Sequence, residues 1–179
     1  MKKKLLFSLT LISHFIYLTL SGQDLNNQES DKKYNHEIGA GAGFTTGYGL
    51  SYRYMPTKYG FQINFAPYHD KEIHRYSVGL TFTYTIIENK MSRLFLYQGN
   101  HFYYNSQLVY VSDPDPTKPY NPGSKKERIS DRYVNNGVGF GIELIIVKRI
   151  GFNLMAGYAS YRNFEELNLT GETALYYKF

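Results

Sequence analysis

The sequence has no cysteine and no tryptophan among its 179 residues. Without cysteine, the chain can form neither a disulfide framework nor a thiolate metal site, and it has no cysteine for lipid attachment behind an export signal. The mean hydropathy of −0.42 is too low for a helical membrane protein. These absences exclude a disulfide-stabilised domain, a lipoprotein and a helical membrane protein.

A strong excess of charge of one sign is also missing. The chain carries 20 Lys and Arg against 15 Asp and Glu, a formal net charge of +5. Three lysines lie within the first four residues, so that removal of residues 1–22 leaves 17 basic against 15 acidic residues, or +2. Because so small a surplus gives little support to nucleic-acid binding, we expect no nucleic-acid partner.

The N-terminus has the layout of a cleaved secretory signal peptide. It combines a basic start at Lys2–Lys4, a mostly apolar stretch to Leu20, and small residues before Gln23. A membrane-anchoring helix is the alternative, but the apolar stretch is short and interrupted by polar residues. We therefore expect residues 1–22 to be a signal peptide and residues 23–35, which lack apolar periodicity, to be a flexible periplasmic lead-in.

Strand-like alternation of apolar with small or polar residues runs through residues 36–179. Its clearest stretch is 73–87, where the large apolar residues all fall on one face. We expect eight antiparallel strands, with alternate links facing outward and the first outward link, near residue 45, shorter than expected. The expected strands are 37–44, 47–55, 60–68, 73–87, 93–111, 132–147, 151–162 and 167–179.

Aromatic and glycine placement favours a closed membrane barrel. The 19 Tyr and 12 Phe make up 17% of the chain, and tyrosine collects at membrane–water boundaries, although a Tyr-rich soluble β-sandwich is the alternative from composition alone. Many of the 16 glycines alternate with large apolar residues, as small inward side chains do in a narrow barrel. The phase of 93–111 is irregular, and we expect a bulge near Gly99 to restore it.

The last ten residues, Thr170–Phe179, are typical of a strand that closes such a barrel. Leu175, Tyr177 and Phe179 share one apolar face, while charged residues lie on the other. An exposed terminal strand of this kind is a liability in a soluble sheet, but it is stable when one face meets lipid and both edges are paired. We expect it to pair with Glu37–Phe44.

The signal-like start, the eight alternating segments and the terminal Leu-Tyr-Tyr-Lys-Phe resemble the small outer-membrane β-barrel family of Gram-negative bacteria, the OmpA/OmpX-like barrels. The resemblance covers about residues 36–179 and implies an all-β, eight-stranded, antiparallel up-and-down transmembrane barrel in outer-membrane lipid. It also implies that Leu175, Tyr177 and Phe179 form the signal read by the barrel-assembly machinery. We expect a monomer, and the family does not imply one function.

Four charged residues are expected to point into the lumen, namely Arg53, Arg75, Glu143 and Glu172. Unpaired charges in a closed space are costly, so we expect these side chains to pair or to contact water as a polar filling. A barrel of eight strands is too narrow for a wide solute pore. From a filled lumen we expect a structural or surface-interaction role for the protein. The alternative function is a gated, porin-like channel for ions or small solutes.

No pattern predicts catalysis, a cofactor or a metal site. Some eight-stranded outer-membrane barrels modify lipids with a His–Ser arrangement, but none of His36, His69, His74 and His101 lies beside a serine in a suitable motif. The histidines and carboxylates of residues 69–74 are interpreted as a polar loop, because no partner ligands are evident elsewhere. A lipid-modifying enzyme and a soluble periplasmic barrel that binds an apolar ligand are the further alternatives.

The segment 112–131 holds four of the six prolines and a run of mixed charges. It lacks strand alternation, so we expect one long outer loop. Its Tyr and basic residues make it a candidate contact for a surface protein or a carbohydrate, and a disordered surface loop is the alternative.

Overall fold

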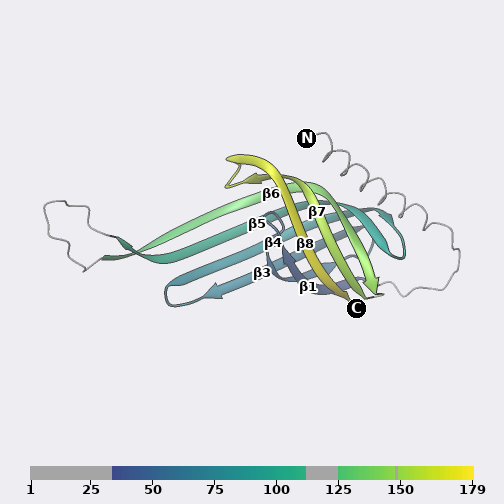
Figure 1. Cartoon of the computed structure of the whole chain (residues 1–179), viewed down its shortest axis with the longest axis horizontal. Coiled ribbons are helices and arrows are strands. Elements are labelled where there is room, and N and C mark those ends of the chain that lie inside the picture. The colour runs from purple at the N-terminus through teal and green to yellow at the C-terminus, as the bar shows by residue number, and fades with distance from the viewer. Residues whose placement is uncertain (1–33, 112–124, 148) are drawn as a thin grey trace, which may run out of the picture.

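The computed structural model describes residues 34–111, 125–147 and 149–179, which form a closed ring of eight antiparallel strands (Figure 1). Each strand pairs with its sequence neighbours, and the last strand pairs with the first, as predicted. The all-β up-and-down barrel is thereby confirmed. The strands are β1 (His36–Ala42), β2 (Gly49–Tyr54), β3 (Tyr59–His69), β4 (Ile73–Glu88), β5 (Ser92–Val111), β6 (Lys125–Val147), β7 (Ile150–Tyr161) and β8 (Glu166–Lys178).

The two ends of the barrel are distinct. The end that holds Phe179 and the β2–β3, β4–β5 and β6–β7 links is called the lower end, and the opposite end is called the upper end. The predicted signal peptide and most of the lead-in fall within residues 1–33, outside the described residues. In the part of the chain that the structure describes, no helix has the length and apolar character needed to cross a membrane.

The strands are staggered around the ring by ten residues. From Ala40, the register partners can be followed from strand to strand in both directions around the ring. Across β2, β3 and β4 they lead to Phe102 on β5, whereas across β8, β7 and β6 they lead to Ser92, ten residues earlier on the same strand. For eight strands, this stagger corresponds to a strand tilt of roughly 40°. A barrel of this size has an interior just wide enough for its own side chains to fill.

The outer wall is a band of large apolar side chains. Leu50, Phe82, Val138 and Leu175 point outward from four different strands, with 52% to 73% of their surface exposed. Apolar exposure on this scale is rare on a soluble monomer, whereas it suits a barrel surrounded by lipid. The apolar and polar faces are therefore inverted relative to those of a soluble barrel.

Tyrosine pairs lie at both margins of this band. The rings of Tyr59 and Tyr84 lie 5.1 Å apart near the lower end, and those of Tyr76 and Tyr104 stack at 6.1 Å near the upper end. Tyr76 and Tyr84 both lie on β4, and eight tilted residues span about 20 Å along the barrel axis. That separation is close to the height of the apolar band in transmembrane barrels, which have aromatic residues at both interfaces.

The β5–β6 pair is longer than the sequence predicted. β6 begins at Lys125, so residues 125–131 pair with β5 and do not belong to the expected loop 112–131. Alternation is weak there because charged and polar residues occupy both faces. The two strands extend as an arm beyond the upper end of the barrel wall (Figure 1).

The bulge predicted near Gly99 was wrong. The pairing of β5 with both neighbours is continuous at Gly99, and the shift between β4 and β5 lies at Thr85–Ile87 instead. Gln98 and Asn100 remain on the outward face and satisfy each other, with 2.8 Å from Gln98 Nε2 to Asn100 Oδ1. Two amides that hydrogen-bond along one face remove the need for a change of register.

Candidate functional site

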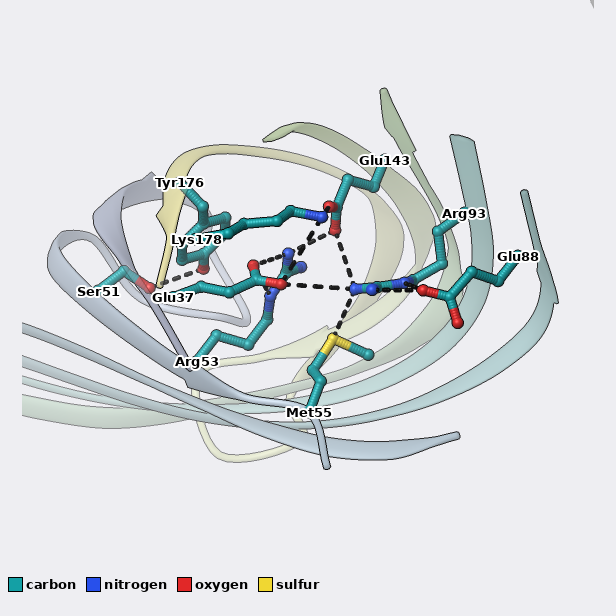
Figure 2. Close-up of polar contacts among 9 residues, drawn as sticks. All are labelled: Glu37, Ser51, Arg53, Met55, Glu88, Arg93, Glu143, Tyr176 and Lys178. Atoms are coloured by element: carbon teal, nitrogen blue, oxygen red, sulfur yellow. Dashed lines mark hydrogen bonds and ion pairs between the residues drawn. The ribbon is translucent and has the colours of Figure 1, made fainter. Parts of the chain in front are cut away.

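The lower lumen contains an ion-pair cluster centred on Arg53 of β2 (Figure 2). Arg53 donates from Nε to Glu37 Oε2 at 2.8 Å, and its Nη2 contacts both Glu37 and Glu143. The guanidinium also lies 4.2 Å from the ring centroid of Tyr176, a cation–π distance. All three ionic side chains are at most 1% exposed, so the centre of this charge cluster is fully removed from solvent.

Two further cations neutralise the two buried carboxylates. Arg93 Nη1 lies 3.4 Å from Glu143 and 3.6 Å from Glu37, and its Nη2 lies 2.7 Å from Glu88. Lys178 pairs with Glu143 and lies 3.8 Å from Glu37. The charges of three acidic and three basic side chains, from six strands, thus balance. The ion pairs avoid the high free-energy cost of an unpaired buried charge.

The four predicted lumen charges do not form one network. Arg53 and Glu143 meet in the charge cluster, whereas Arg75 lies near the upper end, where its Nε is 3.4 Å from Asn105. On β5, the register partners of Arg75 and Glu143 are twelve residues apart, roughly 40 Å along the strand. Glu172 contacts a different group of residues. Alternation predicted the inward face, but it did not predict the height at which each charge lies.

Four members of the charge cluster were missed from the sequence: Glu37, Glu88, Arg93 and Lys178. Glu88 lies one residue beyond the expected strand 73–87. Glu37 and Lys178 share the period-two face of residues that were assigned inward, so phase alone could have found them. Arg93 was hidden because the expected bulge near Gly99 left the phase of β5 undecided.

The link between β1 and β2, residues 43–48, folds into the lumen and is called the plug. Thr45 and Thr46 are 0% and 1% exposed, although they lie in an upper-end link. Three inward glycines contact the plug so closely that an added Cβ on any of them would overlap it or stand within 3.0 Å of its atoms. These glycines are Gly79 of β4, Gly99 of β5 and Gly137 of β6. The expected link of residues 45–46 was therefore too short: β1 ends at Ala42 and β2 begins at Gly49, and the six residues between them turn into the lumen.

Glu172 of β8 holds the plug from the opposite wall. Its carboxylate accepts hydrogen bonds from the backbone N–H groups of Thr45 and Thr46, at 3.2 and 3.0 Å. The hydroxyl groups of Thr45 and Thr170 donate to the same carboxylate. Hydrogen bonds to an ionised acceptor are about twice as strong as neutral ones, so Glu172 is a strong point of attachment.

The carbonyl oxygen of Phe44 is the second attachment point of the plug. It accepts from His101 Nδ1 at 2.9 Å and from Asn135 Nδ2 at 3.0 Å. Because His101 donates from Nδ1, its Nε2 accepts from the Ser77 hydroxyl, 2.9 Å away. This His–Ser contact was missed because the two residues lie on neighbouring strands. Ser77 is 0% exposed and also lies 3.3 Å from Tyr48 N, so the pair positions the plug.

Above the plug, the lumen widens into an open space that is called the vestibule. It comprises two adjoining cavities of about 440 and 350 Å³, which share Phe44, Tyr133 and Asn135 in their walls. The larger cavity is completed by β1, β5 and β8, and the smaller one by β7, β8 and the β7–β8 link. Further lining residues are Tyr48, His101 and Tyr103 in the larger cavity, and Tyr161, Arg162, Glu166 and Asn168 in the smaller one.

The predicted assembly residues lie on the outer wall of β8 at its lower half. Leu175, Tyr177 and Phe179 are each 46% to 53% exposed on the apolar face. The backbone N–H of Phe179 donates to His36 O at 2.8 Å, and their rings stack at 5.9 Å. The terminal residue is thus part of the seam between β8 and β1, and its role as an assembly signal stays a prediction.

The polar segment at the β3–β4 link forms no metal-binding cluster. His69 and His74 face each other in the strand register, with ring centroids 4.0 Å apart. Among residues 34–111, 125–147 and 149–179, no three His, Cys, Asp or Glu side chains are arranged to hold a metal ion.

Comparison with known proteins shows likeness at the level of structure. No family model and no curated protein matches the sequence. The N-terminal β-barrel domain of Pseudomonas aeruginosa OprF is similar with 14% identity and a TM-score of 0.49, over 83% of this chain and 100% of that domain. Neisserial surface protein A has 14% identity and a TM-score of 0.42, over 80% and 93% of the two chains. Ail, the attachment invasion locus protein of Yersinia pestis, has 16% identity and a TM-score of 0.37, also over 80% and 93%.

These proteins are eight-stranded outer-membrane barrels, the family that the sequence resembles. At these sequence identities, the likeness concerns the fold alone, and no role is transferred from these proteins to this chain. The fold of this chain rests on its own closed ring of paired strands.

Proposed function

We propose that this chain is an integral outer-membrane protein whose barrel is a closed anchor for surface interactions and does not conduct solutes. The observation that carries this proposal is the double blockage of the lumen. The charge cluster fills the lower part, and the plug crosses the upper part against glycines of three strands. A permeating ion would have to displace both groups of contacts.

The outer wall supports the membrane location. Its apolar band with tyrosines at both margins matches what a lipid bilayer stabilises, while the charged and polar side chains are turned inward. A soluble barrel that binds an apolar ligand needs the opposite arrangement, with an apolar interior. The wall therefore favours the membrane protein over the periplasmic ligand carrier.

The upper end carries the features that suit contact with other molecules. The β5–β6 arm extends beyond the wall, and the vestibule opens at the same end. We propose a surface protein or a carbohydrate as the partner of the segment 112–131, of which residues 125–131 belong to β6 in the arm. We propose no catalytic role, since the buried His101–Ser77 pair is already used in holding the plug.

Two measurements test this function. The protein is expected in the outer-membrane fraction, with a gel mobility that changes on heating, because a folded barrel resists detergent until it is boiled. In planar bilayers it is expected to give no steady current. Recovery in the soluble periplasmic fraction would contradict the membrane location. Single-channel currents that change in the Glu143→Gln variant would contradict the closed barrel and support the alternative of an ion channel.

A further inference from the structure

Five aromatic rings surround the vestibule. Tyr103 and Tyr133, directly opposed on β5 and β6, stack with ring centroids 4.8 Å apart. On the other side, Phe44 meets Tyr161 edge to face at 6.1 Å. Tyr48, packed edge to face on His101 at 5.9 Å, completes the set. Such rings offer flat apolar faces together with hydroxyl groups at their rims.

The polar groups of the vestibule add up to no net charge. Arg162 lies 3.8 Å from Glu166, so the charged residues among the lining form one pair. Asn135 is used within the protein, donating to Phe44 O and accepting from Arg162 N, whereas the lining residue Asn168 brings an exposed amide. A cationic ligand would need a surplus of carboxylates, and an anionic ligand a surplus of cations. The lining therefore fits a neutral ligand with many hydroxyl groups.

We propose that the vestibule is a binding site for a neutral saccharide ring. A pyranose presents C–H groups on its faces and hydroxyl groups around its edge, which matches aromatic faces with amide and phenol groups at the rim. The larger cavity, at about 440 Å³, lies within the range of small-ligand sites, roughly 300–1,000 Å³. The plug forms its floor and keeps the ligand at the upper end.

This inference rests on the proposed function only for the origin of the ligand, because the surface orientation would expose the vestibule to saccharides outside the cell. Binding itself is measured on the purified chain in detergent, where the membrane location plays no part. A failed membrane fractionation and a failed binding experiment are therefore distinguishable.

Saturation-transfer difference NMR on the full chain in detergent micelles tests the site. The probes are cellotetraose and the core oligosaccharide released from lipopolysaccharide by mild acid, the latter dephosphorylated and carboxyl-reduced so that both probes are uncharged. We expect saturation to reach the ring protons of at least one probe. Transfer to the core oligosaccharide but not to cellotetraose would identify the cell's own glycolipid as the source, and the reverse would identify a free glucan. Absence of transfer to both probes would overturn the proposal.

Variants locate the binding. Tyr133→Ala and, from a different wall, Tyr161→Ala are each expected to weaken the affinity about tenfold, whereas Tyr133→Phe retains most of it because the ring remains. Tyr104→Ala is the matched control, since Tyr104 of β5 faces outward and stacks on Tyr76 of β4, away from the vestibule. Heat-modifiable gel migration verifies that each variant is folded. Equal affinity in the wild type and in both vestibule variants would show that the saccharide binds elsewhere and would overturn the proposal.

Discussion

Replacement of Gly79 by alanine is expected to lower the free energy of unfolding by about 4 kcal/mol. A Cβ at this position would overlap the carbonyl oxygen of Thr46 and stand 2.5 Å from its carbonyl carbon, so the plug must move by about 1.5 Å to restore normal contact. Overpacking alone costs about 1–3 kcal/mol. The plug has little room to move, because Glu172 on the opposite wall already lies 3.0 Å from Thr46 N. The displacement therefore distorts or breaks this hydrogen bond, and such a bond to a charged group is worth about 1.5–3 kcal/mol.

Urea unfolding of the protein in phosphatidylcholine vesicles measures this loss. The chain has no tryptophan, so far-ultraviolet circular dichroism is the suitable signal. Gly171→Ala is the matched control, because an added Cβ on this outward glycine of β8 meets nothing within 4 Å. We expect the control to change the unfolding free energy by less than about 0.5 kcal/mol. Equal unfolding midpoints for the two variants would refute the plug as a packed part of the lumen.

Two other perturbations are informative. Glu143→Gln should lower the unfolding free energy by about 3 kcal/mol in the same assay, because the buried Arg53 and Lys178 lose their shared counter-charge. The control Glu166→Gln removes a carboxylate from an exposed pair and should lower the unfolding free energy by less than about 0.5 kcal/mol. Similar losses for both variants would contradict the importance of the charge cluster. Deletion of Phe179 should reduce the amount of protein in the outer membrane while the rate of synthesis stays the same, whereas Phe179→Tyr should leave that amount unchanged. Normal assembly of the deletion variant would show that the terminal residue is not the assembly signal.

Strand number and facing were predictable from the sequence because alternation is a local property. The stretch 73–87 shows this best, since the structure has β4 at Ile73–Glu88 with the predicted face outward. The pairing of the last strand with residues from Glu37 onward was also predictable, because an even-stranded barrel must close on its first strand. The start of β6 was missed because residues 125–131 are charged or polar apart from Ile129, which leaves no apolar alternation.

The contents of the lumen were far less predictable. Which inward charges meet depends on the ten-residue stagger, a global quantity that no single segment encodes. The plug was equally hidden, because Thr45-Thr46-Gly47 has the composition of an ordinary turn. The inward glycines were recognised as a sign of crowding, but the crowding comes from a chain segment inside the barrel as well as from the opposite wall.

The position of Glu172 constrains the order in which the molecule can assemble. Thr45 and Glu172 are 127 residues apart in sequence, so their contact closes one of the longest loops in the chain and forms late. Glu172 also lies on β8, the strand that completes the seam with β1. Once that seam is formed, the plug can reach the lumen only through the open upper end. The last strand therefore supplies both the seam with β1 and the carboxylate that fixes the plug, so one strand completes the ring and the attachment of the plug.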